Sequence, residues 1–513
     1  MFFFAIYDLN ERVSCSIDTI NVMYPKDVSL GKPQRLGTRF NPRFLSMPTY
    51  GTNQEYIIVD SPENQCKFLQ KVSIKDIKIS AYSKDFQEQD VHRLLSFGLY
   101  CAICDVRPVL HFKKPPNLFL FASVFTKGRG KHIKVLCVLH YEHYSKVVSA
   151  AYRTTGTKYF KMKKPAGYVE TIFVRCLLKI NEECPKQVSI GWVGMTCTDN
   201  LTTLVKVEYQ KLPIGSRKMQ FAYCSSIMYQ LGKQTSTHVR RMAEWIEYMK
   251  LIGFDKMYFQ ITDVEGLEIS PQTKKLIDLH AKTGFVEVSH APGYFDKSSN
   301  VTPSWINVRS MQMFMNNRCL MLHALEYEYI LISDFDEAIA WKDPKISSLK
   351  DLLKEFRPED IKSHISYQFK DRRFTVGCEE HLSSKSKSTY VIDQPGFLLR
   401  YKKATAPPVF GKTLHSTMNC AFVTAHECHE YFTHNSSAAL FFLGNIAAVF
   451  HYRDAKITRR KQFYEITDRV TDFASVKKLC IRAAFQGKNY DWITRHSNVL
   501  LPKINKLLNI IFA

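Results

Sequence analysis

Long apolar runs are scarce in this sequence. The longest, Ala438–Phe450, covers 13 residues and contains Gly444 and Asn445, whereas a membrane-spanning helix needs about 20 apolar residues. The apolar start Met1–Tyr7 turns polar at Asp8 and is too short for an anchor or a signal peptide. The sequence therefore predicts no membrane-spanning helix. It leaves two alternatives, a cytosolic protein or a chain that lacks its targeting segment.

The glycine signatures of three common enzyme classes are absent. The sequence contains no Gly-x-Gly-x-x-Gly, no Walker loop and no Gly-x-Ser-x-Gly. These motifs bring the backbone close to phosphates or expose a nucleophilic serine. Their absence argues against dinucleotide redox chemistry, P-loop hydrolysis and α/β-hydrolase chemistry.

Cysteine motifs for a structural metal are also lacking. The chain has 14 cysteines but a single Cys-x-x-Cys, at Cys101–Cys104. No second pair follows at the spacing of a zinc ribbon, so we expect buried thiols or disulfides of the secretory pathway. Glycosylation sequons begin at Asn200, Asn300 and Asn435 and weakly favour the secretory lumen.

Basic residues outnumber acidic residues, 71 to 48, which gives a formal net charge of +23. This charge favours anionic partners such as nucleotide phosphates, acidic glycans, nucleic acid or a membrane surface. The densest clusters, Lys127–Lys134 and Arg459–Lys461, are short. A hairpin tip and a solvated helix end explain them at least as well as a nucleic-acid site, so we expect no nucleic-acid partner.

The first half of the chain is irregular and then rich in strand-forming residues. We interpret residues 1–65 as a variable leader and residues 66–215 as a β-rich N-terminal domain. Runs of β-branched and aromatic residues predict its strands, at Val72–Ser80, Leu118–Phe125, His132–Val138, Tyr168–Val174, Val188–Val193 and Leu201–Tyr209. The glycine-containing segment between Phe125 and His132 predicts a hairpin that joins two of these strands.

Strands and helices alternate in the second half, over residues 216–480, with residues 481–513 as a C-terminal extension. The pattern begins with a strand at Gln220–Ser225 and a helix that starts near Ser236 and ends at Gly253. Such alternation predicts an α/β domain with a mostly parallel sheet and helices on both faces.

The most informative segment is Tyr329–Glu337, where a short apolar run ends in three carboxylates. An apolar run of this length predicts a buried parallel strand, and ligands of open α/β sheets bind beyond the carboxyl ends of such strands. Asp334 and Asp336 are two residues apart, so in an extended chain both carboxylates lie on one face. Two oxygen donors suit Mg²⁺ or Mn²⁺ with substrate phosphates. Alternatively, the acids cap the following element.

Five segments in a fixed order resemble glycosyltransferase family 92. They are Phe221–Ser226, Glu244–Gly253, Asp334–Glu337, Gly411–Thr413 and His451–Arg453. The resemblance extends over roughly residues 66–480 and is most marked over 217–455. It implies a Rossmann-like glycosyltransferase-A fold. It also implies an inverting transfer of a hexose, galactose in the characterised members, from a UDP-sugar to a glycan or glycoprotein acceptor. Family members are Golgi membrane proteins with lumenal catalytic domains.

The resemblance also implies roles for single residues. Asp334 and Asp336 would hold the divalent metal, Mn²⁺ by expectation, with His451 as the first choice for a further ligand and His426 as the second. Lys412 and Arg453 would bind the diphosphate. An inverting reaction needs a base for the acceptor hydroxyl, and the candidates are Glu379, Glu380 and Glu337.

Two other functions remain open at this point. A phosphohydrolase would attack with Asp334, but that chemistry favours a Thr or Ser close behind, and here Glu337-Ala338 follows. A non-catalytic glycan or polyanion binder is the other alternative. It is motivated by the net charge and by Arg318, which stands where many relatives carry an acid, and by the acidic segment Gly377–His381.

Overall fold

The computed structural model describes residues 97–512 apart from 127–133, 155–167, 180–181, 194–203, 212–218, 229–235, 263–268, 292–304, 356–364, 377–397, 399–402, 405–410, 425, 433–439, 444–445, 455–487 and 490. The chain divides into two compact units, Met1–Tyr209 and Gln210–Ala513. The predicted leader 1–65 and the predicted strand Val72–Ser80 lie outside the described residues. Among the described helices, none is long and apolar enough to span a membrane.

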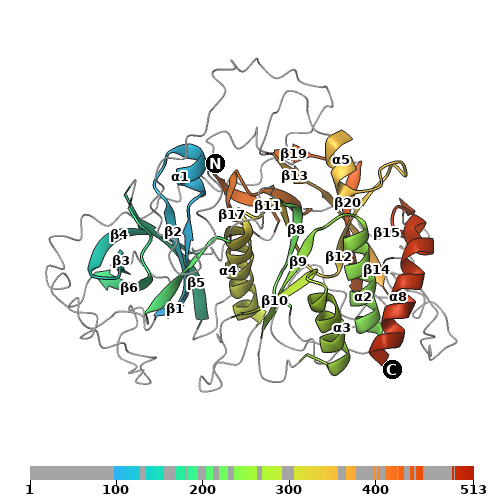
Figure 1. Ribbon diagram of the computed structural model, residues 1–513, viewed down its shortest axis with the longest axis horizontal. Helices are drawn as coiled ribbons and strands as arrows, with labels where there is room; N and C mark the ends of the chain where they lie inside the picture. Colours follow the sequence, from blue (N-terminus) through green and yellow to red (C-terminus); the bar gives the residue numbers. More distant parts are fainter. Residues whose placement is uncertain are drawn as a thin grey trace, which may run out of the picture. The chain divides into compact units, whose positions relative to one another are not determined.

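The first unit is a closed barrel in which the strands follow the order β1-β2-β5-β4-β3-β6-β7 (Figure 1). The strands are β1 (Phe97–Asp105), β2 (Asn117–Thr126), β3 (Lys134–His140), β4 (Ser145–Thr154), β5 (Tyr168–Leu177), β6 (Gln187–Val193) and β7 (Val205–Tyr209), with the short helix α1 (Arg107–Phe112) after β1. All described pairs are antiparallel except β1 with β7, which closes the barrel. Closure removes the open sheet edges that would otherwise invite association.

Alternate residues of the barrel strands point inward and form its core. On β2, for example, Leu118 and Leu120 are fully buried and belong to the inner cluster. Two disulfides, Cys104–Cys184 and Cys137–Cys176, lie in this cluster. Cys104, the second cysteine of the Cys-x-x-Cys pair, is therefore disulfide-bonded.

The predicted hairpin between the strands now labelled β2 and β3 is wrong. Strand β2 pairs with β1 and β5, whereas β3 pairs with β4 and β6. The sequence could not reveal this, because glycine and lysine residues mark where a strand ends but not which strand becomes its neighbour. The strands β1 and β4 were not predicted, although the others were close to their observed bounds.

The second unit is built on a seven-stranded sheet with the order β10-β9-β8-β11-β16-β13-β19. Its strands are β8 (Met219–Ser225), β9 (Lys256–Thr262), β10 (Val286–Ala291), β11 (Tyr327–Ser333), β13 (Ser366–Gln368), β16 (Thr413–Ser416) and β19 (Leu440–Phe442). The strands β10, β9, β8 and β11 are parallel, but β16 is antiparallel to β11 and to β13. The strands β13 and β19 are parallel to each other and run in the same direction as β11. The sheet is therefore mixed through β16 alone, and the prediction of a mostly parallel sheet describes its other six strands.

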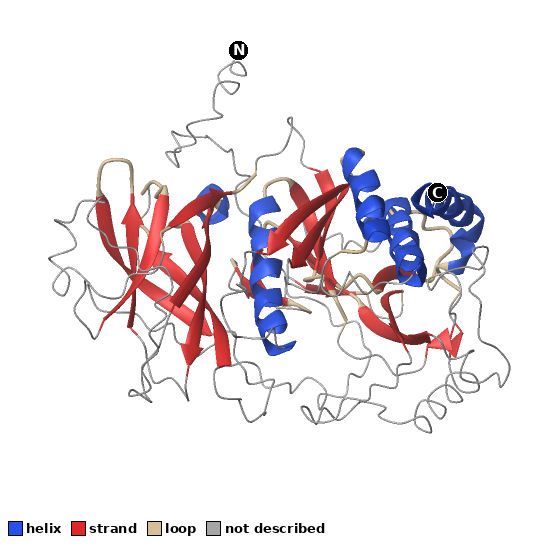
Figure 2. Ribbon diagram, turned by 90° about the horizontal axis from the view of Figure 1, so that it is seen from below, coloured by secondary structure: helices blue, strands red, loops and turns tan. Residues whose placement is uncertain are grey.

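Helices cover both faces of this sheet, as Figure 2 shows. The helices are α2 (Ser236–Leu251), α3 (Pro271–Lys282), α4 (Trp305–His323), α5 (Leu349–Glu355) and α8 (Ser497–Phe512), with a 3-10 turn at Thr494–His496. On β8, Phe221 and Tyr223 pack in the same cluster as α2 and α3, whereas Ala222 and Cys224 pack with α4. Because neighbouring strand residues point to opposite faces, α2 and α3 lie on one face and α4 on the other.

Local signals in the sequence place these helices well. Ser270 caps α3 by accepting a hydrogen bond from the Thr273 N–H at 3.2 Å. Gly253 after α2 and Gly284 after α3 both have positive φ, +103° and +76°. These are conformations that favour glycine at helix ends.

A second, five-stranded sheet has the order β12-β20-β14-β15-β21. It consists of β12 (Glu337–Trp341), β14 (Lys370–Val376), β15 (Lys403–Ala404), β20 (Ala447–Asp454) and β21 (Lys488–Asn489). A separate hairpin joins β17 (Cys420–Val423) to β18 (Cys428–Tyr431). The chain passes from the first sheet to the second between β11 and β12.

The predicted C-terminal extension contains a helix that belongs to the core of the second unit. The inner side of α8 carries Leu500, Ile504, Leu508 and Ile511, which are buried in the same cluster as α2. The helices α2, α3 and α8 contact one another and lie side by side in Figure 1. The segment 481–513 therefore contributes directly to the packing of this unit.

Candidate functional site

The carboxylates that follow β11 lie in a tight turn. Glu337 donates its backbone N–H to the Asp334 carbonyl at 3.1 Å, and its side-chain Oε2 accepts the Asp334 N–H at 2.9 Å. The expectation that Asp334 and Asp336 share one face of an extended strand is therefore wrong. The chain turns here because β11 belongs to one sheet and β12 to the other. As a result the two aspartates contact different partners.

Lys412 is the cationic partner on the Asp334 side. Its Nζ lies 3.1 Å from Glu337 Oε2 and 3.9 Å from Asp334 Oδ2. Only 3% of the Lys412 side chain is exposed, whereas 41% of Asp334 is exposed. The ammonium group thus contacts two carboxylates of the protein, and the contact of Lys412 with a diphosphate stays a prediction. Asp334 and Asp336, whose side chain is 34% exposed, are the two carboxylates of the turn that a ligand can reach.

His451 is the centre of the Asp336 side. Its Nε2 lies 3.5 Å from Asp336 Oδ2, and its Nδ1 lies 3.4 Å from Glu337 Oε1 and 3.8 Å from Asp371 Oδ1. Glu337 and His451 are directly opposite each other on the antiparallel strands β12 and β20. The backbone N–H of Tyr452 also donates to the Asp336 carbonyl at 2.9 Å. The structure thus brings together the predicted residues Asp334, Asp336, Glu337, Lys412 and His451.

These contacts and burial shift the pKa values of His451, Glu337 and Asp334. Burial works against the charged form of His451, but Asp336, Asp371 and Glu337 outweigh it and raise its pKa to about 10. Burial raises the pKa of Glu337 to about 7 even though Lys412 opposes the shift. For Asp334, burial is likewise opposed by the Lys412 charge and the Ser226 hydroxyl, and its pKa is lowered. The site is therefore a network of alternating charges.

The geometry favours a positioning role for Glu337 over that of the catalytic base. Its Oε2 accepts from the Asp334 N–H and contacts Lys412, while its Oε1 faces His451. The side chain is 4% exposed. A base must reach the acceptor hydroxyl, and both oxygens of this carboxylate are already engaged inside the protein.

Two side chains of helix α2 donate hydrogen bonds to β12, the strand that follows the turn. Trp245 donates its indole N–H to the Glu337 carbonyl at 2.9 Å, and Tyr248 donates its hydroxyl to the Ile339 carbonyl at 2.7 Å. Strand β12 pairs with β20 on one side only, so these side chains satisfy carbonyls on its open edge. The motif Glu244–Gly253 thus positions the carboxylate turn. Trp341, in contrast, is buried and donates its indole N–H to the Ile346 carbonyl, so it is a packing residue.

The segment Gly411–Thr413 fits tightly against strand neighbours. A Cβ atom at Gly411 would lie 1.4 Å from the Phe369 carbonyl oxygen, so only glycine fits there. Lys412 accepts the Phe369 N–H through its own carbonyl at 2.9 Å. The sequence order Gly-Lys-Thr therefore places a buried lysine next to the carboxylates by means of a close backbone approach.

His426 lies in the turn between β17 and β18 and contacts the same segment. Its Nδ1 is 3.2 Å from the Gly411 carbonyl, and its own carbonyl accepts the Thr413 hydroxyl at 2.9 Å. Because a carbonyl only accepts, Nδ1 carries the proton and Nε2 keeps its lone pair. Burial and the nearby Lys412 charge lower the pKa of His426 to about 4. His426 is therefore a neutral ring next to the site.

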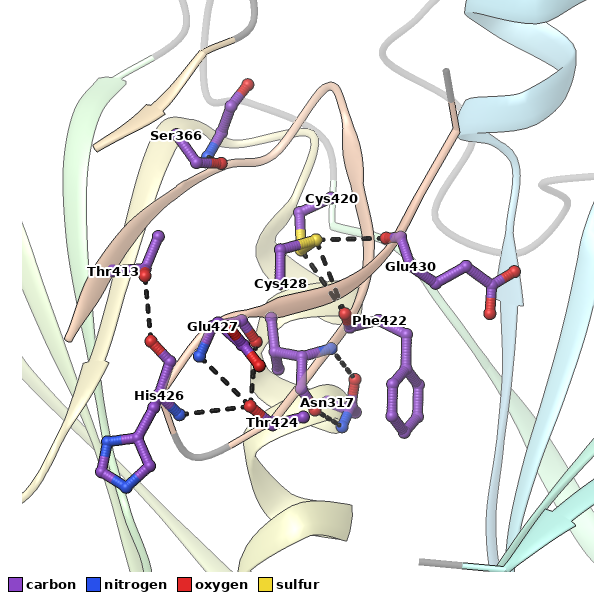
Figure 3. The surroundings of a disulfide bond; sticks show 12 residues. Asn317, Ser366, Thr413, Cys420, Phe422, Thr424, His426, Glu427, Cys428 and Glu430 are labelled. Atoms are coloured by element: carbon purple, nitrogen blue, oxygen red, sulfur yellow. Dashed lines mark hydrogen bonds between the residues drawn. A yellow bond between two sulfur atoms is a disulfide. The ribbon is translucent and has the colours of Figure 1, made fainter. Parts of the chain in front are cut away.

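The hairpin that carries His426 is fixed to helix α4 (Figure 3). Asn317 accepts the Val423 N–H at 2.8 Å and donates to the Val423 carbonyl at 2.9 Å. The disulfide Cys420–Cys428 closes the hairpin. A further disulfide, Cys224–Cys319, ties α4 to β8. The residues on either side of Arg318 thus have structural roles.

Some predicted residues cannot be placed. Glu379 and Glu380 lie outside the described residues, as do the sequons at Asn200, Asn300 and Asn435. Arg453 continues β20 beside Thr375 of β14. Its side chain is outside what the structure describes.

Asp371 is a site residue that the sequence analysis missed. It lies on β14 and is 4% exposed. In the sequence it stands 80 residues before His451, in the unremarkable segment Lys370–Arg373. The sequence analysis predicted no strand there, and this acid becomes informative only once β14 is known to pair with β20.

Two donors of the kinds that bind divalent cations face each other in the site. Asp336 Oδ2 and His451 Nε2 face each other at 3.5 Å, close to the roughly 3 Å between two adjacent ligands of an octahedral ion. Asp334 offers a second, partly exposed carboxylate. Over the described ranges, no three His, Cys, Asp or Glu side chains already form a gathered ligand set. The structure thus provides a facing pair of donors with an accessible carboxylate nearby.

Comparison with known proteins identifies one family. The family model described as glycosyltransferase family 92 matches residues 220–485, just over half of the 513-residue chain. The matched region contains every site residue discussed above. Among curated proteins, no significant match is found.

Solved structures give only distant similarity. The apo structure of the bifunctional glycosyltransferase WbbM is 11% identical, with a TM-score of 0.18, and covers 35% of this chain; this chain spans 28% of the length of that protein. Ferredoxin-NADP⁺ reductase from Plasmodium falciparum with 2'P-AMP is 12% identical, with a TM-score of 0.14, covering 47% of this chain and 88% of that one. TM-scores this low carry no argument about fold or function.

Proposed function

The chain belongs to glycosyltransferase family 92, and from this premise we propose that it is a metal-dependent inverting glycosyltransferase. The donor would be a UDP-sugar, UDP-galactose in the first place, and the acceptor a glycan or glycoprotein. The observation that carries the proposal is the facing pair Asp336 and His451 beside the accessible Asp334, at the end of β11. This site lies within the region that matches the family.

The position of the site in the sheet supports nucleotide binding. Asp334 follows the carboxyl end of β11, next to Ser226, which donates its backbone N–H to the Ser333 carbonyl at 2.9 Å. The strands β8 and β11 are parallel neighbours that end together here. Ligands bind at the carboxyl ends of such strands in open α/β sheets. The mixed sheet with helices on both faces is compatible with the Rossmann-like glycosyltransferase-A fold that we propose for this unit.

Each site residue would then have its own role in the transfer reaction. Asp336, His451 and Asp334 would hold Mn²⁺, which when bound neutralises the charge that develops on the UDP diphosphate as the glycosidic bond breaks. Arg453 would contact that diphosphate. Glu337 and Lys412 would hold the turn in place. Glu379 and Glu380 remain the candidates for the base that deprotonates the acceptor hydroxyl.

Disulfides support a location in the secretory pathway. The described residues contain four, two in each unit. Disulfides of this kind persist in oxidising compartments and are rare in the cytosol. We therefore place the catalytic unit in the Golgi lumen as part of the proposal.

A transfer assay tests the proposal directly. Purified protein is incubated with UDP-galactose, Mn²⁺ and a panel of glycans, with UDP-glucose as an alternative donor. We expect transfer from UDP-galactose that EDTA abolishes. Asp336→Asn should reduce kcat/KM by about 100-fold or more, because one bond to the metal is lost. The control Asp278→Asn, an exposed acid on α3 paired with Lys274, should leave transfer unchanged.

Three negative results together would contradict the proposal. Absence of transfer and of UDP release, together with no UDP binding by calorimetry, would exclude a UDP-sugar transferase. Salt-sensitive binding of polyanions without turnover would instead favour the non-catalytic relative that Arg318 and the net charge suggest.

A further inference from the structure

The outer side of α8 carries apolar and basic side chains in one stripe. Val499 and Ile510 are 47% and 44% exposed, and the exposed residues Lys503 and Lys506 lie between them in the sequence. Neighbouring positions of this set are three or four residues apart, so at 3.6 residues per turn they lie on one side of the helix. The opposite side of α8 is buried in the core cluster of this unit. The stripe therefore faces solvent.

Exposed large apolar side chains are concentrated on this helix. Helix α8 also exposes Phe512, at 43%. In the rest of the described chain, the other large apolar side chains that are exposed are Tyr144 and Leu177 of the barrel unit. A single exposed apolar residue is ordinary, whereas several on one element indicate an interaction surface.

Positive charge dominates the helices that pack together here. The helices α2, α3 and α8 contact one another and lie side by side (Figure 1). Of their acids, Glu244 is buried and Glu247 is 13% exposed, whereas Asp278 pairs with Lys274 at 2.6 Å. Helix α8 contains neither Asp nor Glu. The lysines of these helices are all exposed, namely Lys250, Lys274, Lys275, Lys282, Lys503 and Lys506. This side of the unit therefore suits an anionic partner.

We propose that the outer sides of α3 and α8 form a surface that binds a membrane containing anionic lipids. Helices that lie on membranes combine lysines with apolar side chains, which enter the boundary between headgroups and acyl chains. The long lysine side chains then reach the lipid phosphates. An acidic glycan would pair with the same lysines but would gain little from Val499 and Ile510, so the apolar part of the stripe favours a lipid surface. No residue of this surface belongs to the candidate transferase site.

Vesicle co-sedimentation of the full chain tests the proposal. Vesicles of phosphatidylcholine alone are compared with vesicles that also contain phosphatidylserine, and we expect binding to the second kind. Each lysine close to an anionic membrane strengthens binding about 5-fold. Replacing Lys503→Glu together with Lys506→Glu should therefore weaken binding by about 25-fold or more. The matched control replaces Lys179→Glu and Lys206→Glu, two exposed lysines of the barrel unit, and should bind like the wild type.

A second pair of variants separates a lipid surface from an acidic glycan. Replacing Val499→Ser together with Ile510→Ser should weaken vesicle binding about 10-fold or more and leave heparin binding unchanged. All these positions are exposed, and thermal unfolding verifies that each variant folds. Absence of wild-type binding to anionic vesicles would overturn the proposal, as would wild-type vesicle binding by the folded Lys503 and Lys506 pair. Heparin binding together with vesicle binding that the apolar pair leaves unchanged would show a glycan surface and contradict the membrane.

Discussion

At the scale of single residues, the site pairs buried charged side chains with two partly exposed aspartates. Lys412 lies between Glu337 and Asp334, and His451 lies between Glu337 and Asp336. A buried charge is tolerated only when an opposite charge compensates it, and removing one partner of such a pair is strongly destabilising. Charge pairs within the protein therefore hold the carboxylate turn in place, and a reacting group needs such support from its surroundings.

Gly411 provides a residue-level test of this packing. We expect Gly411→Ala to lower the free energy of unfolding by about 3 kcal/mol or more, because its Cβ would overlap the Phe369 carbonyl. Gly284→Ala is the matched control. It has positive φ but no atom within 4 Å, so it should cost only about 1 kcal/mol of backbone strain. Urea unfolding measures both, and equal effects would contradict the packing argument.

The imidazole of His451 predicts a pH dependence of the metal-free protein. Its pKa is raised from 6.5 to about 10 in the folded state, so its protonation stabilises the fold fully below pH 6.5. This contribution is lost as the pH rises through 10. In EDTA, the wild type should lose stability between pH 7 and 10, by at most about 5 kcal/mol. The variant His451→Gln should lack this part of the pH dependence in thermal unfolding, and identical profiles would contradict it.

At the scale of elements, the site depends on how α2 and β20 hold β12. Strand β12 gains backbone partners from β20 on one side and side-chain donors from α2 on the other. The hairpin of β17 and β18 is tied to α4 by Asn317. The described site residues Glu337 and His426 are thus held by elements distant from them in the sequence.

Trp245 tests the contact between α2 and β12. The variant Trp245→Phe leaves the Glu337 carbonyl without its buried donor, so we expect a loss of about 1–3 kcal/mol of stability and weaker Mn²⁺ binding. Trp341→Phe removes a comparable bond, to the Ile346 carbonyl, away from the turn. It should cost similar stability without changing the affinity measured by calorimetry. A loss of Mn²⁺ affinity in both variants would show that either change loosens the second unit as a whole, and would contradict a specific role of Trp245.

At the scale of the whole molecule, the chain is built as two units with separate cores. The described disulfides each join cysteines of the same unit. The barrel has its own closed hydrogen-bond network and its own inner cluster. Such organisation favours independent folding.

A fragment experiment tests this independence. We expect the fragment Gln210–Ala513 to fold alone, because its sheets, its helix α8 and its two described disulfides are internal to it. Scanning calorimetry of the full chain should then show two transitions, one of which matches the fragment. A fragment that is unfolded, or a single transition in the full chain, would show that the second unit depends on the first.

Much of the second unit was predictable because its signals are local. Ser270, Gly253 and Gly284 mark helix ends by their own conformational preferences, and the bounds predicted for β8 and β11 are close to those observed. Strand neighbours were not predictable in this way. The hairpin expected between β2 and β3 failed, and the antiparallel entry of β16 went unnoticed, since pairing depends on contacts between distant segments.

The sequence by itself determined the family, the α/β alternation and the carboxylates that follow a buried strand, because short-range patterns carry that information. Only the tertiary structure decided what each charged side chain does. It turned Asp334 and Asp336 towards different partners, buried Lys412 among acids and brought Asp371 to His451. The physical reason is that burial and charge pairing depend on distances between residues far apart in the chain, which only the packing of two sheets sets.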